Sequence, residues 1–527
     1  MPSDSTLPAL VERHARDSPD APFVVFAEDA STWSYGTAWR EAQRWAEAVH
    51  TAGVGPGDTV LTMLPPGRES VACWVGIARL RAMDVPINTG YVGRLLGYVL
   101  ADARARLMIV HADYLPAVAE ALAELPEPST VVVVGGPVPP GWSGSARVVT
   151  AQDFLAAAPG TEHRAIDRPS VRDIAHIIYT SGTTGPSKGV LVTWRQTELT
   201  ARECMPASLC GDQDAFYSPF PMFHVSARGP IEGAALLGAR VIMRRRFETG
   251  EFWSDIRRYG GTTTILLGAM ANFIHQQPPR PDDGDSPLRD VVMIPLIDDV
   301  AGFSRRFDLG VRTVFNMTET SCCIVSDGYN LANTTSCGRV RPGFQARIVD
   351  SDDVEVGPDE LGELVLRADE PWALMAGYWG KPEATVTAWR NQWLHTGDGF
   401  TRDADGNFYF VDRIKDAIRR RGENISSFEV ELEVNSHPDV LESAAVAVPS
   451  EHGEDEIKVV VVAQPGAVVA PEELWDYLSA RMARFMVPRY VEIVESLPKT
   501  PTEKVRKVEL RASGIGSDTW DARERTR

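Results

Sequence analysis

Residues 179–190 read Tyr-Thr-Ser-Gly-Thr-Thr-Gly-Pro-Ser-Lys-Gly-Val and constrain the chain more than any other stretch. A buried-strand pattern, Ala-His-Ile-Ile-Tyr at 175–179, leads directly into them. Glycines let backbone N–H groups turn toward an anion without a Cβ in the way, and the hydroxyls and Lys188 add donors and a positive charge. The order differs from the Walker pattern, in which Gly-Lys-Ser/Thr opens a helix. A Ser/Thr/Gly linker is the plain alternative, but such a linker rarely follows a buried strand, so the string predicts a polyphosphate-binding loop.

Composition narrows the class of protein. A chain of 527 residues is too long for one small domain, and 44% hydrophobic content indicates a globular protein. The net charge of −19, without a basic block, disfavours nucleic acid and anionic membrane surfaces as partners. No apolar run reaches membrane-spanning length and no signal segment precedes the fold, so we expect a cytoplasmic protein without a membrane span. The six cysteines show no CxxC spacing, which argues against a zinc site and a disulfide framework.

The order of the expected elements predicts the fold class. Strand, turn and helix patterns alternate between residues 58 and 157, which favours layered α/β structure with parallel strands. Shorter strands with Gly and Asp turns follow from 338 to 411 and predict a β-rich subdomain, and the Pro/Asp-rich segment 278–287 is expected to be mobile. We therefore expect a large N-terminal α/β domain and a small mobile α+β C-terminal domain. The expected boundaries are 1–411 for the N-terminal domain, 412–415 for a hinge, 416–512 for the C-terminal domain and 513–527 for a disordered tail.

Three further strings carry side chains suited to nucleotide chemistry. Thr-Val-Phe-Asn-Met-Thr-Glu-Thr at 313–320 places Glu319 where a carboxylate could hold Mg²⁺ against phosphate oxygens. Trp-Leu-His-Thr-Gly-Asp-Gly at 393–399 contains Asp398, a carboxylate that can accept from two ribose hydroxyls. Pro-Lys-Thr-Pro-Thr-Glu-Lys-Val-Arg-Lys at 498–507 contains Lys504, whose ammonium could stabilise charge that builds in a transition state.

Together these strings resemble the adenylate-forming superfamily, which holds acyl-CoA synthetases, peptide-synthetase adenylation domains and luciferases. The resemblance covers about residues 8–510. Within the superfamily the chain looks most similar to carnitine/crotonobetaine-CoA ligases, partly because of Val-Pro-Ile-Asn-Thr-Gly-Tyr at 85–91 and Leu95-Leu96. It implies ATP, Mg²⁺ and CoA as cofactors. It also implies a C-terminal domain that rotates between two half-reactions around Lys415.

The resemblance assigns roles to individual residues. The phosphates would be held by Thr180, Ser181, Gly182, Thr183, Thr184, Gly185 and Lys188. The nucleoside would be contacted by Phe315, Asn316, Asp398, Phe410 and Arg413. Catalysis would involve Lys504, Thr318, Glu319 and His224, with Glu319 also binding the metal. The acid pocket would include Phe223, His224, Arg228, Gly268, Ala269 and Met270.

Some positions depart from the family pattern. Phe315 stands where tyrosine is usual, which keeps a stacking ring and loses a hydroxyl. Glu503 stands where glycine is usual, and it could pair with a neighbouring lysine. Residues 292–297 carry larger side chains than the Gly/Ala-rich turn of many members, so the nucleotide or acid pocket could differ in shape.

Other residues have two interpretations. Asp298 and Asp299 either cap the next helix or face a cationic substrate group. Arg228 either meets a second anionic group of the acid or lies in an ion pair. The arginines at 419–421 either meet the phosphates of CoA or form a solvated charge run.

The expected reaction joins an acid to ATP, releasing pyrophosphate, and passes the acyl group to a thiol, most simply that of CoA. One alternative acceptor is the arm of a carrier protein. Another alternative is an unusual acid such as nitrite, passed to an amine in a diazotase-like reaction of secondary metabolism. A silent nucleotide-binding protein is disfavoured by the presence of Lys504, Glu319 and Asp398. The sequence does not name the acid, and formation of a homodimer is left open.

Overall fold

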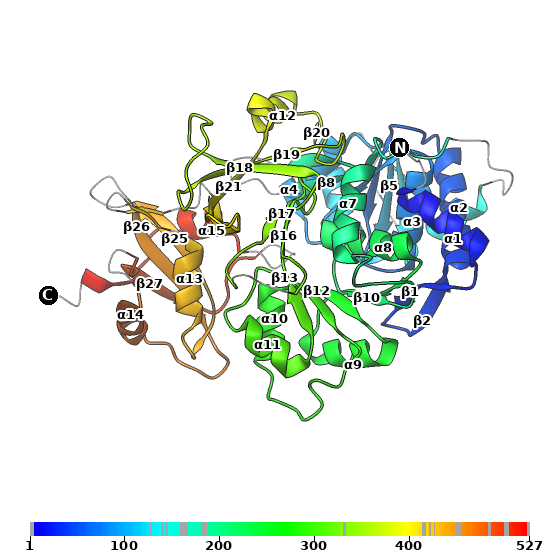
Figure 1. The fold of residues 1–527 in the computed structure, drawn as a ribbon. Coiled ribbons are helices and arrows are strands. Elements are labelled where there is room, and N and C mark those ends of the chain that lie inside the picture. The colour runs from blue at the N-terminus through cyan, green and yellow to red at the C-terminus, as the bar shows by residue number, and fades with distance from the viewer. Residues whose placement is uncertain are drawn as a thin grey trace. The chain divides into compact units, whose positions relative to one another are not determined.

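The structure is a computed structural model of the chain, and it divides into two compact units. Unit 1 comprises Met1–Gln345 and Leu366–Leu394, and unit 2 comprises Ala346–Val365 and His395–Arg527. Figure 1 shows the elements in chain order, and each unit is described by itself. The structure describes residues 5–123, 125, 128–138, 142, 146–158, 167–180, 187–329, 334–413, 418–420, 423–425, 427–449, 455–482, 486–499 and 505–523.

The first sheet of unit 1 has eight strands in the order β20-β9-β8-β4-β3-β5-β6-β7. Strands β8, β4, β3, β5, β6 and β7 run parallel, and β9 returns antiparallel to β8. The strands are β3 (Thr59–Met63), β4 (Met83–Pro86), β5 (Leu107–His111), β6 (Thr130–Val134), β7 (Arg147–Thr150), β8 (Ile174–Thr180), β9 (Lys188–Thr193) and β20 (Gly377–Tyr378). The helices between them are α3 (Arg68–Arg79), α4 (Gly93–Ala103), α5 (Leu115–Leu122) and α6 (Ala151–Ala156).

The second sheet of unit 1 has seven strands in the order β14-β13-β12-β10-β11-β1-β2, all parallel except β2. The strands are β1 (Pro22–Phe26), β2 (Ser31–Ser34), β10 (Ala215–Ser218), β11 (Arg240–Met243), β12 (Thr263–Leu267), β13 (Asp290–Ile294) and β14 (Gly310–Arg312). The helices are α1 (Leu7–Asp17), α2 (Tyr35–Thr51), α7 (Trp194–Cys204), α8 (Val225–Leu237), α9 (Thr249–Tyr259), α10 (Gly268–His275) and α11 (Val300–Phe307).

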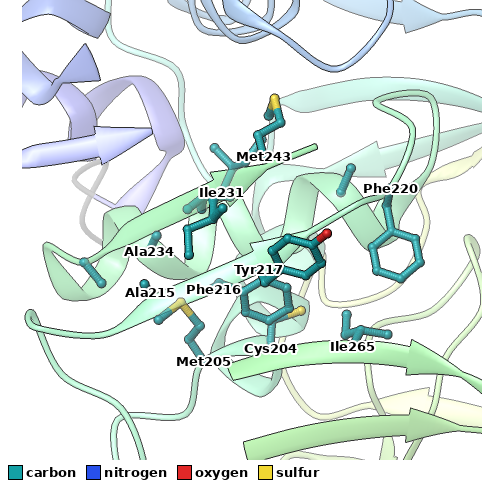
Figure 2. Close-up of a cluster of buried hydrophobic side chains, with 14 of the residues drawn as sticks. Cys204, Met205, Ala215, Phe216, Tyr217, Phe220, Ile231, Ala234, Met243 and Ile265 are labelled. Carbon is teal, nitrogen blue, oxygen red and sulfur yellow. The ribbon is translucent and has the colours of Figure 1, made fainter. Parts of the chain in front are cut away.

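A buried apolar cluster joins this second sheet to its helices. In Figure 2, Phe216 and Tyr217 of β10 lie in one cluster with Ile231 and Ala234 of α8. These side chains are fully buried, so their removal from water holds α8 on the sheet.

Two glycines let α7 and α8 approach closely. A Cβ on Gly229 would lie 2.9 Å from the Sγ of Cys204, and a Cβ on Gly233 would lie 2.9 Å from the carbonyl oxygen of Ala201. A larger side chain at Gly233 would require a helix to shift, because it would meet backbone, whereas at Gly229 the Cys204 side chain would have to rotate. The two helices are therefore packed backbone against backbone.

The last sheet of unit 1 is small and antiparallel, and it contains part of the string 313–320. It consists of β15 (Val314–Phe315), β16 (Ile324–Val325) and β17 (Arg339–Val340), in that order. Helix α12 (Pro382–Ala388) follows β20. Thr313 separates β14 from β15, and its hydroxyl donates to the carbonyl oxygen of Met293 at 2.8 Å. The chain therefore leaves the large sheet just before Phe315.

Most of unit 2 is formed by the C-terminal residues. One four-stranded sheet contains β18 (Phe344–Val349), β19 (Gly362–Ala368), β21 (Leu394–Arg402) and β22 (Phe408–Arg413). The remaining elements are β23 (Ile418–Arg420), β24 (Glu423–Ile425), α13 (Ser427–Asn435), β25 (Val440–Pro449), β26 (Asp455–Ala463), α14 (Pro471–Ser479), β27 (Tyr490–Val494), α15 (Lys507–Ala512) and β28 (Trp520–Asp521). The fold is thus mixed α/β, with a large N-terminal part and a smaller C-terminal part, as expected.

The division into units differs from the simple cut expected after residue 411. Residues 346–365 and 395–411 group with the C-terminal residues because their strands pair with one another in one sheet. Lys415, the expected hinge, lies outside the described residues.

The Pro/Asp-rich segment 278–287 is held in place, although mobility was expected. Arg306 of α11 pairs with Asp283 at 2.7 Å and donates to the carbonyl oxygens of Gln277 and Pro278 at 2.8 and 3.2 Å. A guanidinium carries five N–H donors, so one arginine can bind several backbone carbonyls of a segment. The composition of the segment itself does not reveal such a partner.

The segment from residue 513 was expected to be disordered, and residues 513–523 instead have defined contacts. Strand β28 pairs antiparallel with β27, and Asp521 accepts two hydrogen bonds from Arg489 at 3.0 and 2.8 Å. The ammonium of Lys458 donates to the carbonyl oxygen of Gly514 at 2.6 Å. The segment is polar, so it lacked an apolar pattern, but backbone pairing and charged donors hold it.

We predict that Asp521→Asn lowers the free energy of unfolding by about 1 kcal/mol at pH 7. Burial raises the pKa of Asp521, but hydrogen bonds from Arg489 and the Arg523 N–H outweigh this, so the pKa lies below its ordinary value. A carboxylate with a depressed pKa stabilises the fold above its unfolded pKa, and this contribution is lost as the pH falls through the folded pKa. The difference between wild type and Asp521→Asn in urea unfolding should therefore shrink below about pH 4.

Asp518→Asn is the matched control for this prediction. Asp518 is exposed and contacts the hydroxyl of Ser517, so its replacement should leave the unfolding midpoint unchanged. An Asp521→Asn protein with the wild-type midpoint at pH 7 would contradict the proposed anchoring of the segment.

Candidate active site

The expected phosphate loop connects two paired strands of the first sheet. Strands β8 and β9 are antiparallel, and Thr180 at the end of β8 lies opposite Lys188 at the start of β9. Ser181, Gly182, Thr183, Thr184 and Gly185 lie outside the described residues. Thr180 and Lys188, the two described residues of the seven expected to hold the phosphates, are thus brought together at the base of a hairpin.

A chain of contacts joins Lys188 to Glu319. The ammonium of Lys188 lies 4.7 Å from the ring centroid of Tyr378, and the Tyr378 hydroxyl donates to Oε1 of Glu319 at 3.0 Å. Tyr378 is placed by β20, which pairs antiparallel with β9. A cation and a carboxylate therefore contact the same tyrosine, one at its ring and the other at its hydroxyl. Tyr378 is not predicted from the sequence, where its one signal is an aromatic pair, Tyr-Trp, between Gly377 and Gly380. Both glycines have positive φ in the structure.

Asp102 of α4 supports this corner of the site. Its carboxylate accepts from the Tyr179 hydroxyl at 2.8 Å and from the Lys381 ammonium at 3.0 Å, and its carbonyl oxygen accepts from the Trp379 indole at 2.9 Å. Burial and the hydrogen bond to Asp102 raise the pKa of the Tyr179 phenol. The phenol therefore remains a donor, and the residue before the phosphate loop is fixed to the strand that carries Tyr378.

The segment with Thr318 and Glu319 is held by a buried glutamine. Nε2 of Gln196, on α7, donates to the carbonyl oxygens of Thr318 and Thr320 at 2.8 Å each. The backbone N–H of Met375 donates to the carbonyl oxygen of Glu319 at 3.0 Å. Three successive carbonyls of the signature are thus bound from two other elements. No local motif marks Gln196, because its partners are more than a hundred residues away.

The residues expected at the acid end lie along one edge of the second sheet. Strands β10, β12 and β13 are parallel neighbours, and the residues that follow their carboxyl ends include 223–224, 268–270 and 295–299. Ligands of open α/β sheets bind at this edge. Phe223, Gly268 and Met270 are buried, whereas Ala269 is exposed. A Cβ on Gly268 would lie 3.2 Å from the carbonyl oxygen of Pro295, so the expected pocket turn packs directly against the bulkier segment 292–297.

His224 and Asp299 both cap helices at this edge. His224 Nδ1 accepts from the Ser226 N–H at 3.2 Å at the start of α8, and the ring is partly buried. Asp299 Oδ1 accepts from the Gly302 N–H at 2.8 Å at the start of α11, so of its two interpretations the helix cap is the one present. Asp298 is exposed.

Arg228 lies in a buried ion pair. Its Nη2 is 2.5 Å from Oδ2 of Asp84 on β4, and both side chains are almost fully buried. Nε donates to the carbonyl oxygen of Met222 at 2.7 Å, and the guanidinium lies 4.5 Å from the ring centroid of Trp74. Of the two interpretations of Arg228, the ion pair is the one that the structure contains.

Asp398 is buried on β21 in unit 2, opposite Arg413 of β22. Its backbone N–H donates to the Thr396 hydroxyl at 3.1 Å, just after Gly397 with φ of +73°. Phe410, expected at the nucleoside, makes edge-to-face contacts with Phe400 and Phe428 at 5.6 and 6.4 Å between ring centroids.

Lys504 itself lies outside the described residues, but the segments on either side of it are described. Lys499 and Val505 form an antiparallel bridge, and the Arg506 N–H donates to the Pro498 carbonyl oxygen at 2.7 Å. The ammonium of Lys499 is 2.6 Å from Glu442 on β25. The two segments that flank Lys504 are therefore paired with each other.

The interpretation of Arg420 as a CoA-phosphate contact is wrong. Its Nε is 2.6 Å from Oε2 of Glu456, and its Nη1 donates to the carbonyl oxygen of Val487 at 2.8 Å, with the residue 7% exposed. Strand alternation turns Arg420 to the buried face with Ile418, which the charge run concealed. Arg421 and the side chain of Arg419 lie outside the described residues.

Comparison with known proteins identifies the family. The family model described as AMP-binding enzyme matches residues 11–379, and that described as AMP-binding enzyme C-terminal domain matches residues 429–504. The chain belongs to the AMP-binding enzyme family. The adenylate-forming resemblance is thereby confirmed, the mixed α/β fold agrees with solved structures of similar fold, and the protein is an enzyme of this family.

Individual relatives agree with this assignment. A crotonobetaine/carnitine–CoA ligase from Salmonella arizonae is 29% identical over 500 residues, which cover 93% of this chain and 95% of that protein. The anthranilate CoA ligase AuaEII, solved with anthranoyl-AMP, has a TM-score of 0.85 at 22% identity, covering 97% of this chain and 99% of that chain. ATP-bound MatB from Rhodopseudomonas palustris has a TM-score of 0.82 at 23% identity, covering 97% and 98%.

Ligases of this family use ATP, Mg²⁺ and CoA, and the described residues at the phosphate hairpin and at Glu319 fit the first two. Among the described residues no group of three or more His, Cys, Asp or Glu side chains could form a protein-only metal cage. Mg²⁺ commonly binds through one or two carboxylates together with substrate phosphates and water, and Glu319 beside the phosphate hairpin suits that pattern. Within the described part of the chain, no helix has the length and apolar character to cross a bilayer.

We predict that Gln196→Met lowers the free energy of unfolding by about 2 kcal/mol and raises the KM for ATP. Methionine matches glutamine in length but cannot donate, so the buried carbonyls of Thr318 and Thr320 would lose their partner. Urea unfolding and ATP-dependent pyrophosphate release measure the two effects. Gln345→Met is the control, because Gln345 makes an exposed contact with Asp369. An unchanged ATP KM in Gln196→Met would show that Gln196 does not position the signature.

Proposed function

We propose that this protein activates an organic acid as an acyl-adenylate and transfers the acyl group to the thiol of CoA. The contact chain from Lys188 through Tyr378 to Glu319, at the base of the phosphate hairpin, is the observation that supports this most directly. Lys188 is a cation suited to phosphate oxygens, and Glu319 is a carboxylate suited to a hard divalent cation. Both contact the same tyrosine, Tyr378.

In the first step a carboxylate oxygen of the acid attacks the α-phosphorus of ATP. A new O–P bond forms, and the bond to the β-phosphate oxygen breaks as pyrophosphate leaves. Thr180 and Lys188 would bind the phosphates, and Thr318 would contact the reacting carboxylate or the α-phosphate. Glu319 would hold the metal ion, which neutralises phosphate charge when bound. Lys504 would bridge the acid and the α-phosphate as charge develops.

In the second step the sulfur of CoA attacks the acyl carbon, and the bond to AMP breaks. Phe223, His224, Gly268 and Met270 would border the acid at the edge where β10 and β12 end. The Salmonella relative acts on crotonobetaine or carnitine according to its name, and AuaEII on anthranilate. We infer a small carboxylic acid for this chain, because the segment 292–297 fills space beside Gly268 with larger side chains.

A panel of acids tests the function. Crotonobetaine, anthranilate, benzoate, short alkanoates and nitrite are incubated with ATP and Mg²⁺, and pyrophosphate release is measured with and without CoA. We expect one or more carboxylic acids to support release, and an acyl-CoA product to appear when CoA is present. Release with nitrite alone, without stimulation by CoA, would overturn the proposed reaction.

Glu319→Gln tests the metal role. Removing the charge while keeping the shape should raise the Mg²⁺ concentration needed for half-maximal activity by about tenfold, because a neutral amide is a weaker ligand for a hard cation. Thermal stability should change little, since Glu319 is partly exposed. The measurement is pyrophosphate release over a magnesium titration. Wild-type activity at limiting Mg²⁺ would show that the metal is held elsewhere.

Lys504→Ala tests the two half-reactions separately. We expect formation of the acyl-adenylate to fall by about a hundredfold or more, as for loss of one donor to transition-state charge. Transfer to CoA from supplied acyl-AMP should proceed near the wild-type rate. Arg506→Ala, whose exposed side chain pairs with Glu509, is the nearby control. Equal loss in both half-reactions would contradict a role confined to adenylation.

A further inference from the structure

The Arg228–Asp84 ion pair connects the two large sheets of unit 1. Asp84 lies on β4 of the eight-stranded sheet, opposite His176 of β8, the strand that runs to Thr180. Arg228 lies on α8, which packs on the seven-stranded sheet. The pair therefore joins β4, which neighbours the strand that enters the phosphate hairpin, to the helix that His224 caps.

Asp84 is fully engaged within this contact. Its Oδ1 accepts from the Thr62 hydroxyl at 2.6 Å, while its Oδ2 faces Nη2 of Arg228. Burial lowers the pKa of Arg228, and the charge of Asp84 opposes that shift. Nη1 of Arg228 has no hydrogen-bond partner in the structure, but the charge of the guanidinium is already balanced by Asp84 and the side chain is buried, which disfavours a second anion there.

The guanidinium also holds the backbone of the acid-end turn. Nε of Arg228 donates to the carbonyl oxygen of Met222, the residue before Phe223 and His224. The surroundings are poor in hydrogen bonds: among the described residues, both ring nitrogens of His176, Nε1 of Trp74 and Nη1 of Arg228 itself are buried without a hydrogen-bond partner. In such a poorly solvated setting a single charged hydrogen bond to a carbonyl is stronger than at the surface.

We propose that Arg228 is a positioning residue that sets the turn Met222–His224 for acid recognition without touching the acid. This rests on the proposed function. The ion pair with Asp84 fixes the guanidinium, and Nε fixes the turn that carries Phe223 and His224. Changes at Arg228 should therefore alter recognition of every acid to a similar extent and leave ATP binding nearly unchanged.

Arg228→Lys separates the two contacts. Lysine keeps a positive charge near Asp84 but has no Nε–H for the carbonyl of Met222. We expect the KM for the acid to rise about tenfold while the KM for ATP changes less than twofold. Hydrogen–deuterium exchange of the peptide 219–226 should become faster, and this readout does not depend on catalysis.

Arg312→Lys is the matched control. Arg312 is also buried, pairs with Asp290 at 2.8 Å and donates to the backbone carbonyl of Cys204 at 3.0 Å. A lysine there should destabilise the fold similarly but leave the acid KM and exchange at 219–226 unchanged. If Arg228→Lys does not accumulate as folded protein, the double variant Asp84→Asn/Arg228→Gln removes both charges and should show the same rise in acid KM.

The outcomes distinguish three possibilities. A larger penalty for a dicarboxylic acid than for its monocarboxylic analogue in Arg228→Lys would show direct contact with the acid and overturn the proposal. Identical acid KM and exchange in Arg228→Lys and Arg312→Lys would also overturn it. If wild type releases no pyrophosphate with any acid, the proposed function fails, and the exchange experiment still decides whether Arg228 positions the turn.

Discussion

Unit 1 depends on a buried charge pair between its two sheets. Arg228 and Asp84 are both removed from water, and each would be costly to bury alone. Their pairing fixes α8 relative to β4, and the close contact of α8 with α7 through Gly229 and Gly233 extends the constraint. The ion pair of Arg228 with Asp84 therefore helps to fix β4, α8 and α7 relative to one another.

Helix α7 supports the nucleotide signature through a contact of its own, which does not involve Arg228. Gln196 on α7 binds the backbone on both sides of Glu319, and His224 caps α8 at the acid end. The helix pair thus supports both ends of the proposed reaction centre. Because buried hydrogen bonds and close packing tolerate little displacement, the two ends are held at a fixed separation within unit 1.

Much of the fold and the family could be predicted from patterns of residues that are close together in the sequence. The alternation of strands and helices, the strand before the phosphate loop and the signature around Glu319 are encoded by neighbours in the sequence, and the fold and the family agree with them. The roles of the individual site residues stay predictions. What the sequence did not reveal depends on distant partners: Tyr378 reaches Lys188 through pairing of β20 with β9, and Gln196 reaches its carbonyls across the fold. Arg420 was misjudged because a run of like charges hides strand alternation, and residues 513–523 because polar residues can be held by backbone pairing.

The chain passes between the two units three times, after Gln345, Val365 and Leu394. One sheet contains β18, β19, β21 and β22, so a cut after Leu394 would leave β19 without its neighbour β21. An unpaired edge strand invites association with other chains. A junction placed after Arg413 would leave this sheet intact. A chain truncated after Leu394 should therefore aggregate, whereas one truncated after Arg413 keeps all four strands of this sheet.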